Sequence, residues 1–234
     1  MIYEYLIFNA LIVAGPLASS WMRPMRYVQK WPRVLLATLP VAAVFIAWDI
    51  AVTGRHWWFN YDYTLPLRML GLPLGEWLFF FTVPFACLLI WEGLKARQAF
   101  EGECVIWRVG SIPITVGFAV LGIVFWLMGK EYTALASFAM TASFLLDRVL
   151  GVNVFMRRRA TVFLFFVIGL TAIFNMYLTA RPVVLYGEEF QLGFRVITIP
   201  IEDFFYGMAL LGSVLVLYEK LGERMKVAKG NDAD

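Results

Sequence analysis

Pro73-Leu74-Gly75-Glu76-Trp77 begins an apolar stretch that closes with Trp91-Glu92, and Pro200-Ile201-Glu202-Asp203-Phe204 begins a second one that closes with Tyr218-Glu219. The two stretches match without a gap when they are offset by 127 positions. Strict identities are few, so the signal lies in where the proline, the acids and the aromatic residues stand. The chain is therefore predicted to contain two equivalent units, each with carboxylates at the start of an apolar helix.

Composition places these carboxylates in a membrane protein. Of the 234 residues 61% are hydrophobic and only 16% are charged, and the mean hydropathy is +0.73, far from the balance of a soluble domain. Crossing the hydrocarbon core takes about 20 mostly apolar residues. We expect an all-α membrane protein with seven transmembrane helices over residues 2–22, 34–53, 74–94, 105–128, 132–150, 160–180 and 199–219.

The distribution of basic residues orients this bundle. Of the 20 Lys and Arg residues, 15 fall at alternate helix ends on one side. Because cytoplasmic loops accumulate Lys and Arg, the pattern predicts an external N-terminus and a cytoplasmic C-terminus in a multi-pass protein of the cell (inner) membrane. The net charge of +3 is explained in the same way. Membrane lipid is an expected partner and nucleic acid is not.

The helix count also arranges the two units. Residues 1–95 form a first three-helix repeat, 105–128 a linker helix, 132–221 a second three-helix repeat, and 222–234 a cytoplasmic tail. A single linker helix makes both repeats run in the same direction, related by an axis along the membrane normal. The offset supports this across the units, because it also pairs Tyr5 with Tyr132. Glu76 would then face Glu202 or Asp203 across the axis.

The acids can be explained in two ways. Asp and Glu are favoured in the first turn of any helix, next to its dipole. However, their recurrence in two units, with Asp49 and Asn175 near the same membrane level, favours an internal polar pocket. Phenylalanines follow the acids into the hydrocarbon, and aromatic faces stabilise cations. Such a pocket suits the protonation of an alkene and the shielding of a carbocation. Trp57 and Trp58 are assigned to an interfacial aromatic belt.

Other chemistries lack a pattern in the sequence. His56 is the single histidine, and Cys87 and Cys104 have no metal-ligand or disulfide spacing. There is no glycine-rich dinucleotide or phosphate loop. The segment 199–219 contains no lysine for a retinal Schiff base. No metal and no cofactor are predicted.

At this point the residues resemble a known family. Asn60 within Trp58-Phe59-Asn60-Tyr61, the two acidic helix starts with their Phe-Phe runs, and the aromatic-Glu endings are similar to the membrane-integral lycopene cyclase family. Residues 198–206 are the most specific stretch. The resemblance implies isomerising ring closure on lycopene or a related linear carotenoid, without net redox change. The family pattern has paired acids in each unit, whereas Gly75 replaces one of them here. This departure raises the question of whether both units are catalytic.

The residues are assigned roles on this basis. Glu202 is expected to be the general acid, with Asp203 or Glu76 as its partner and proton acceptor, because neighbouring carboxyl groups can share a proton. Arg68 and Arg195 either hold one acid ionised or are solvated loop charges. Glu92 and Glu219, at the cytoplasmic helix ends, are expected to be topological and not catalytic. The expected substrate-binding residues are Asp49, Asn60, Asn175, Phe79, Phe80, Phe204, Phe205, Arg68 and Arg195.

Two other classes stay open. A small transporter could share parallel three-helix repeats, and polar residues along its whole pathway would favour it. A non-catalytic carotenoid-binding or assembly subunit would be consistent with the missing acid at Gly75. The sequence also leaves open whether the chain forms a homo-oligomer or associates with other enzymes of carotenoid metabolism.

Overall fold

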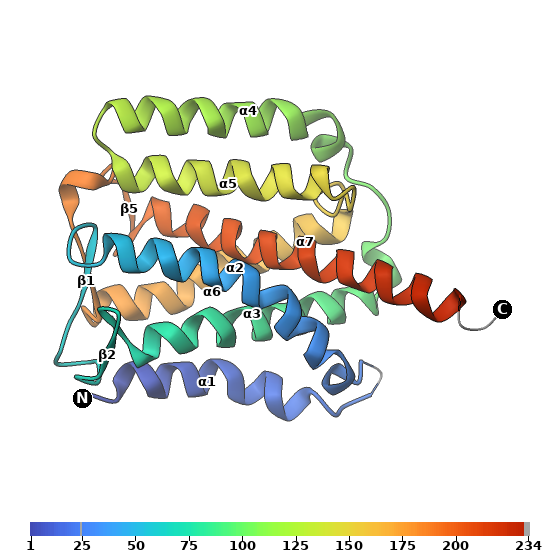
Figure 1. Ribbon diagram of the computed structural model, residues 1–234, viewed down its shortest axis with the longest axis horizontal. Helices are drawn as coiled ribbons and strands as arrows, with labels where there is room; N and C mark the ends of the chain where they lie inside the picture. Colours follow the sequence, from blue (N-terminus) through green and yellow to red (C-terminus); the bar gives the residue numbers. More distant parts are fainter. Residues whose placement is uncertain (24, 232–234) are drawn as a thin grey trace.

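The computed structural model describes residues 1–23 and 25–231, with side chains through Met225. The described residues form seven α-helices and six short strands (Figure 1). The helices are α1 (Glu4–Ser19), α2 (Trp31–Val52), α3 (Leu74–Lys95), α4 (Val105–Leu127), α5 (Glu131–Val149), α6 (Arg158–Ala180) and α7 (Ile201–Asn231).

Five of these helices, α2, α3, α4, α6 and α7, are long and apolar enough to cross a membrane, and α1 is a shorter apolar helix. The chain is therefore a membrane protein, as its composition predicts. The first residue of each helix lies within a few positions of the start of the segment predicted for it. The helix α7 continues beyond the predicted segment 199–219 through Asn231, into the residues predicted as a cytoplasmic tail. Residues 232–234 lie outside the described part of the chain.

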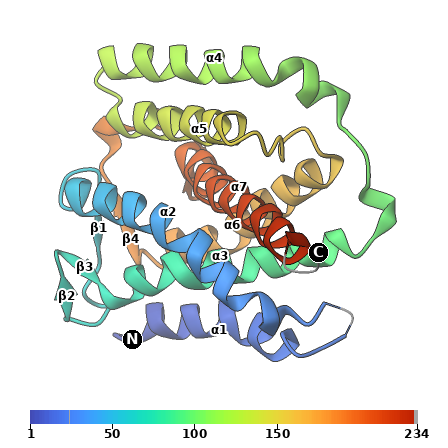
Figure 2. The same ribbon diagram turned by 45° about the vertical axis from the view of Figure 1, so that its right-hand side comes forward.

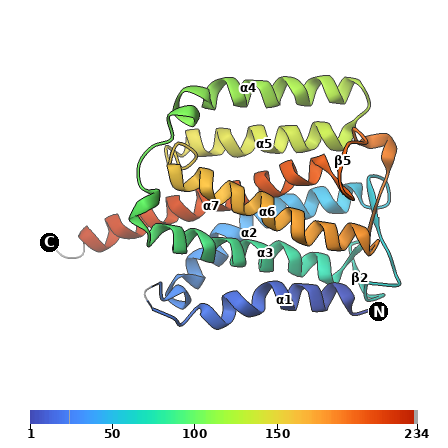
Figure 3. The same ribbon diagram turned by 180° about the vertical axis from the view of Figure 1, so that it is seen from behind.

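All six strands lie at one end of the bundle, which also holds the N-terminus and is called the strand end below (Figures 1 and 3). The strand β1 (Trp57–Phe59) pairs with β4 (Val184–Tyr186), joining the long loops of the two units. Two hairpins lead into α3 and α7: β2 (Arg68–Met69) with β3 (Leu72–Pro73), and β5 (Arg195–Val196) with β6 (Ile199–Pro200).

The two hairpins have the same pairing register at the 127-position offset. Arg68 is opposite Pro73 in one, and Arg195 is opposite Pro200 in the other. Their turns match as well, since Leu70 (φ 51°) and Ile197 (φ 60°) both adopt a left-handed conformation that non-glycine residues seldom use. The local structure before both acidic helix starts is thus repeated along with the sequence.

The helices are arranged around α3 and α7. Both α2 and α6 pack against α3 and also against α7, so each central helix has neighbours from both units. At one edge α1 packs on α3, and at the other α5 packs on α7 and carries α4 on its outer side (Figures 1 and 2). The helix α4 buries little of its surface, which fits a linker between two units.

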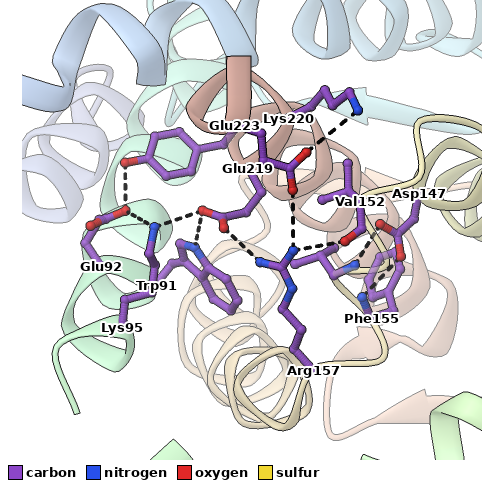
Figure 4. A network of polar contacts seen from close by, with 12 residues as sticks. Trp91, Glu92, Lys95, Asp147, Val152, Phe155, Arg157, Glu219, Lys220 and Glu223 are labelled. Carbon is purple, nitrogen blue, oxygen red and sulfur yellow. Dashed lines mark hydrogen bonds and ion pairs between the residues drawn. The ribbon is translucent and has the colours of Figure 1, made fainter. Parts of the chain in front are cut away.

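The end opposite to the strands, called the basic end below, holds a buried polar network between α3 and α7 (Figure 4). Trp91 Nε1 donates to Glu219 Oε1 over 3.0 Å, and the Tyr218 hydroxyl donates to Glu92 Oε1 over 2.9 Å. Trp91 corresponds to Tyr218, and Glu92 to Glu219, at the offset of 127. Each unit therefore supplies the hydrogen-bond donor for the carboxylate of the other.

Cations compensate both of these buried carboxylates. Lys30 pairs with Glu92, and Arg157 pairs with Glu219 at 2.9 Å, each 62 positions ahead of its partner. Arg33 and Lys95 also contact Glu219, both at 3.1 Å. An uncompensated charge in such a place would be costly. Glu92 and Glu219 therefore have a structural role that the expected topological one did not include, because they join the two units.

Candidate active site

Three buried carboxyl groups from three helices meet in one cavity at the strand end. Asp49 comes from α2, Glu76 from α3 and Asp203 from α7, and their exposed fractions are 1%, 8% and 4%. The cavity lies between the ends of the helices and the β1–β4 pair. It is lined by Tyr5, Asp49, Trp57, Phe59, Glu76, Phe79, Tyr132, Asn175, Leu178, Val184, Tyr186, Asp203 and Tyr206.

Asp203 is held by three hydrogen-bond donors. The Tyr132 hydroxyl reaches Oδ1 at 2.6 Å, and the Tyr186 hydroxyl and Asn175 Nδ2 reach Oδ2 at 2.7 and 3.1 Å. Burial, together with the charge of Asp203, raises the pKa of Tyr186 well above its usual value, so this hydroxyl keeps its proton and donates. Three donors aimed at one carboxylate stabilise its ionised form.

Glu76 has the equivalent arrangement with a single donor. The Tyr5 hydroxyl donates to Glu76 Oε2 over 2.5 Å, and the sequence separation of 71 equals that of Tyr132 and Asp203. The ring of Tyr5 lies directly on Gly75, where an added Cβ would be 2.7 Å from Tyr5 Cγ. The sequence departs from the paired-acid pattern at Gly75, and the structure shows that no side chain fits there while Tyr5 binds Glu76.

Asp49 completes the cavity beside Glu76. Its Oδ1 accepts hydrogen bonds from Trp57 Nε1 at 2.6 Å and from Thr53 Oγ1 at 3.2 Å. Its Oδ2 is buried and has no partner among the described residues. The carboxyl groups of Asp49 and Glu76 line the same cavity. In the cavity the first unit thus contributes two acids, Asp49 and Glu76, and the second contributes Asp203 and the amide of Asn175 that donates to it.

The charge balance of the cavity follows from its lining. Three carboxyl groups line it, and none of the lining residues is Lys or Arg. Several uncompensated charges in a medium of low dielectric constant repel one another strongly, so a proton shared among the carboxyls is favoured. The lining also lacks any His or Cys, and within the described residues no group of His, Cys, Asp and Glu is arranged to hold a metal ion.

Glu202 lies outside this cavity. It is fully buried, and its Oε1 accepts hydrogen bonds from Thr133 Oγ1 at 2.6 Å and from the Leu192 backbone N–H at 2.8 Å. The side chain therefore ties α7 to α5 and to the loop before the β5–β6 hairpin. Glu202 was expected to share a site with Glu76 and Asp203, but the structure brings only the latter two together, along with Asp49.

The remaining predicted residues divide between the cavity and its surroundings. Asn175 and Phe79 line it. Phe80 and Phe204 are buried in the core, and Phe205 packs edge-on against Phe118 of α4 at 5.5 Å between ring centroids.

The predicted loop residues have local partners. Asn60 accepts a hydrogen bond from the backbone of Asp62. Arg68 and Arg195 bond to backbone carbonyls of their own loops, and their guanidinium groups lie over the rings of Tyr61 and Tyr186. These contacts order the loops around the site and do not place the three side chains in its lining.

Several cavity residues were not predicted as site residues. Tyr5 and Tyr132 were aligned by the offset, and this repetition of a polar aromatic residue is the signal that could have marked them. Trp57 was assigned to the interfacial belt, but it is 6% exposed and bonds Asp49, because the β1–β4 pair folds its loop back over the helix ends. Trp58, at 42% exposure, points outward as a belt residue would.

Fold and site together define a membrane protein of two like units that places carboxyl groups from both in one buried aromatic cavity. A comparison with protein families adds that the family model described as lycopene cyclase matches residues 3–94 and 129–221. The chain therefore belongs to the lycopene cyclase family. The two matched segments are the two units, and α4 lies between them.

The family membership assigns the chain to carotenoid biosynthesis as a membrane-bound cyclase that acts on a carotenoid. Searches of curated proteins and of solved structures found no match.

Proposed function

We propose that this protein closes the acyclic end groups of lycopene, or of a related linear carotenoid, to ionone-type rings by proton transfer and without net redox change. One observation carries the proposal: carboxyl groups of both units meet at a single buried cavity walled by aromatic rings. The reaction needs an acid, a base and protection of a cation from water, and this cavity contains groups suited to each task.

The reaction consumes and returns one proton for each ring. A carboxylic acid protonates C2 of the terminal C1=C2 double bond, which leaves a tertiary cation at C1. The electrons of the C5=C6 double bond then form the C1–C6 bond and move the cation to C5. Loss of the proton from C6 to a base restores a double bond and gives a β-type ring. Substrate and product are isomers, so no electron acceptor or donor is required.

The acid in this proposal is the Asp49–Glu76 pair. Both carboxyl groups are buried and line one cavity whose lining has no cation, so a proton held between them would be available to an alkene placed against it. The Trp57 and Thr53 donors fix the orientation of Asp49, and Tyr5 fixes that of Glu76.

The proton acceptor in this proposal is Asp203. Its three donors favour the ionised carboxylate, and the amide of Asn175 supplies no competing acid. Ionised Asp203 and the aromatic faces of the cavity would both stabilise the carbocation. This assignment differs from the one based on sequence alone, which made Glu202 the acid. Glu202 is given a positioning role here, because it orders the start of α7 immediately before Asp203.

The arrangement in the membrane is part of the proposal. Seven crossings, with units 1–95 and 132–221 running in parallel around the linker helix, agree with the repeated hairpin registers and the repeated Tyr–acid bonds. The charge distribution would put the strand end outside and the basic end in the cytoplasm of the inner membrane. The carotenoid would then enter the site from the lipid.

Expression in bacterial cells that accumulate lycopene tests the function. Wild-type protein should convert lycopene to cyclic products, and Glu76→Gln and Asp203→Asn should abolish conversion while the protein stays in the membrane at normal amounts. Glu103→Gln is the matched control, because this side chain is exposed at the basic end. Undiminished conversion by both site variants would refute the assignment, and no conversion by the wild type would favour a non-catalytic carotenoid-binding role.

A second measurement tests the chemistry. Membranes containing the protein, supplied with lycopene in heavy water and no added nucleotide, should give product with one deuterium at C2 for each ring formed. Product without deuterium would exclude an acid that exchanges with solvent. An absolute requirement for a reduced nucleotide or flavin would show that the reaction needs a further group.

A further inference from the structure

An apolar groove continues from the carboxyl cavity toward the middle of the helices. The two share Phe79, Asn175, Asp203 and Tyr206 in their linings, so they adjoin each other. The groove runs between α1, α3, α6 and α7. Beyond the shared residues its walls are Ile12, Val83, Ala86, Cys87, Val167, Leu170, Thr171, Phe174, Gly207, Leu210 and Leu211.

The length of the groove can be judged from the helices that form it. Leu211 lies eight residues after Asp203 on α7, and Cys87 lies eleven residues after Glu76 on α3. At a rise of about 1.5 Å per residue, the groove extends roughly 12–16 Å from the carboxyl groups along the helices. Its far walls are almost entirely hydrocarbon. The chemistry of these walls suits an apolar chain whose end lies at the carboxyl groups.

Gly207 provides the space for the groove on α7. A Cβ atom at this position would already lie 3.2 Å from Thr171 Oγ1 on α6. The residue that corresponds to Gly207 in the first unit is Phe80, whose ring is fully buried. A glycine in one unit thus matches a packed phenyl ring in the other.

The space between α7 and α2 is filled. The Tyr206 ring packs against Phe45 and Trp48 of α2, with centroids 5.0 and 4.9 Å apart. The pseudo-symmetric arrangement of the helices is therefore broken by side-chain size, with open space on the α6 side and rings in edge-on and tilted contact on the α2 side.

We propose that this groove binds the polyene chain of the carotenoid and that Gly207 is the residue that sets its width. The inference rests on the proposed function, because the end group of the same molecule would occupy the carboxyl cavity. It adds one defined orientation of the substrate, in which the polyene lies between α6 and α7 and the end group passes Asn175 and Tyr206 to reach the acids.

Filling the groove tests this inference. Gly207→Phe introduces into the second unit the phenyl ring that Phe80 has at the equivalent position of the first unit. Gly207→Ala narrows the groove less than Gly207→Phe does. Gly169→Phe is the control on α6, since Gly169 is exposed and an added Cβ there has no atom within 4 Å. Two quantities are measured for each protein: the carotenoid (lycopene together with its cyclic products) retained per protein after detergent purification, and the initial rate of cyclisation in membranes.

We expect Gly207→Phe to retain less than a tenth of the carotenoid that the wild type retains and to lose at least 90% of the cyclisation rate. Gly207→Ala should raise the KM more than it lowers kcat, and Gly169→Phe should equal the wild type. If Gly207→Phe does not accumulate in the membrane, Val83→Trp, on the facing wall of α3, replaces it with the same expectation.

The outcomes separate the two proposals. Normal carotenoid retention and a normal cyclisation rate in Gly207→Phe or Val83→Trp would overturn the proposal that the groove binds the polyene. If the wild type retains lycopene without cyclising it, and Gly207→Phe loses this retention, the groove is supported as the polyene site and the catalytic function is overturned. Wild-type protein that neither binds nor cyclises lycopene would overturn both.

Discussion

A Gly75→Ala substitution should destabilise the protein and lower its activity, even though alanine favours helix formation by up to about 1 kcal/mol over glycine. The added methyl group would lie 2.7 Å from Cγ and Cδ1 of Tyr5 and 3.0 Å from its Cβ. Carbon atoms in ordinary contact are about 3.5 Å apart or more. The Tyr5 ring therefore has to move by about 0.8 Å, away from the helix that carries Glu76.

The structure gives the size of this effect. Overpacking of this kind costs about 1–3 kcal/mol. The displacement also weakens the 2.5 Å hydrogen bond from Tyr5 to Glu76, and a bond to a charged group contributes about 1.5–3 kcal/mol. The overpacking cost and the weakened hydrogen bond overlap, and together they exceed the free energy that alanine gains over glycine in a helix. We expect the free energy of unfolding to fall by about 2–4 kcal/mol, and the cyclisation rate to fall at least tenfold because Glu76 loses its orienting donor.

The assay compares Gly75→Ala with Gly169→Ala, where the new methyl group meets no atom within 4 Å. Unfolding in detergent is followed by circular dichroism, and cyclisation is measured in membranes from the same preparations. The two variants should shift stability in opposite directions, because only the helix preference acts at Gly169. A Gly75→Ala protein as stable and as active as the wild type would refute the argument that Gly75 is required by Tyr5.

Three further predictions concern other parts of the molecule. Glu219→Ala leaves Arg33, Lys95 and Arg157 without their shared carboxylate, so it should lower the free energy of unfolding in detergent by about 3–5 kcal/mol. Glu103→Ala removes an exposed ion pair and should lower it by less than about 1 kcal/mol in the same assay. Burial lowers the pKa of His56 below 6.5 despite the Glu131 carboxylate 3.1 Å from Nε2. The unfolded chain then binds a proton first as the pH falls below about 6.5, so the wild type should lose thermal stability between pH 7.5 and 5.5 more steeply than His56→Gln, and equal slopes would contradict this. A reporter fused after Asp234 should be cytoplasmic and one inserted at Lys130 external, and finding both on one side would exclude the proposed seven crossings.

The positions of the helices could be predicted because the bilayer imposes their length. A segment such as 160–180 has few alternatives once about 20 apolar residues must cross hydrocarbon, and α6 occupies Arg158–Ala180. The offset of 127 also predicted which residues are equivalent, and it holds for the hairpin registers and for the Tyr5–Glu76 and Tyr132–Asp203 bonds.

The direction of individual side chains could not be predicted in the same way. Glu202 and Asp203 are consecutive, and consecutive residues on an α-helix point about 100° apart. One of them had to leave the cavity, and only the structure shows that Thr133 and the Leu192 backbone bind Glu202 while Asp203 faces Glu76. Trp57 belongs to a loop whose path depends on pairing with β4, more than a hundred residues later. The residues around Trp57 do not predict that pairing.

The exchange of partners between the units has a consequence for how the protein is made. The first unit is synthesised first, yet Glu4 pairs with Arg181 and Tyr177, and Arg55 pairs with Glu131, all of which come after the linker helix α4. Until the second unit arrives, the first holds acids and bases whose partners do not yet exist. The carboxyl cavity is lined from both units, so it can form only after α7 has been made and has packed against the first unit.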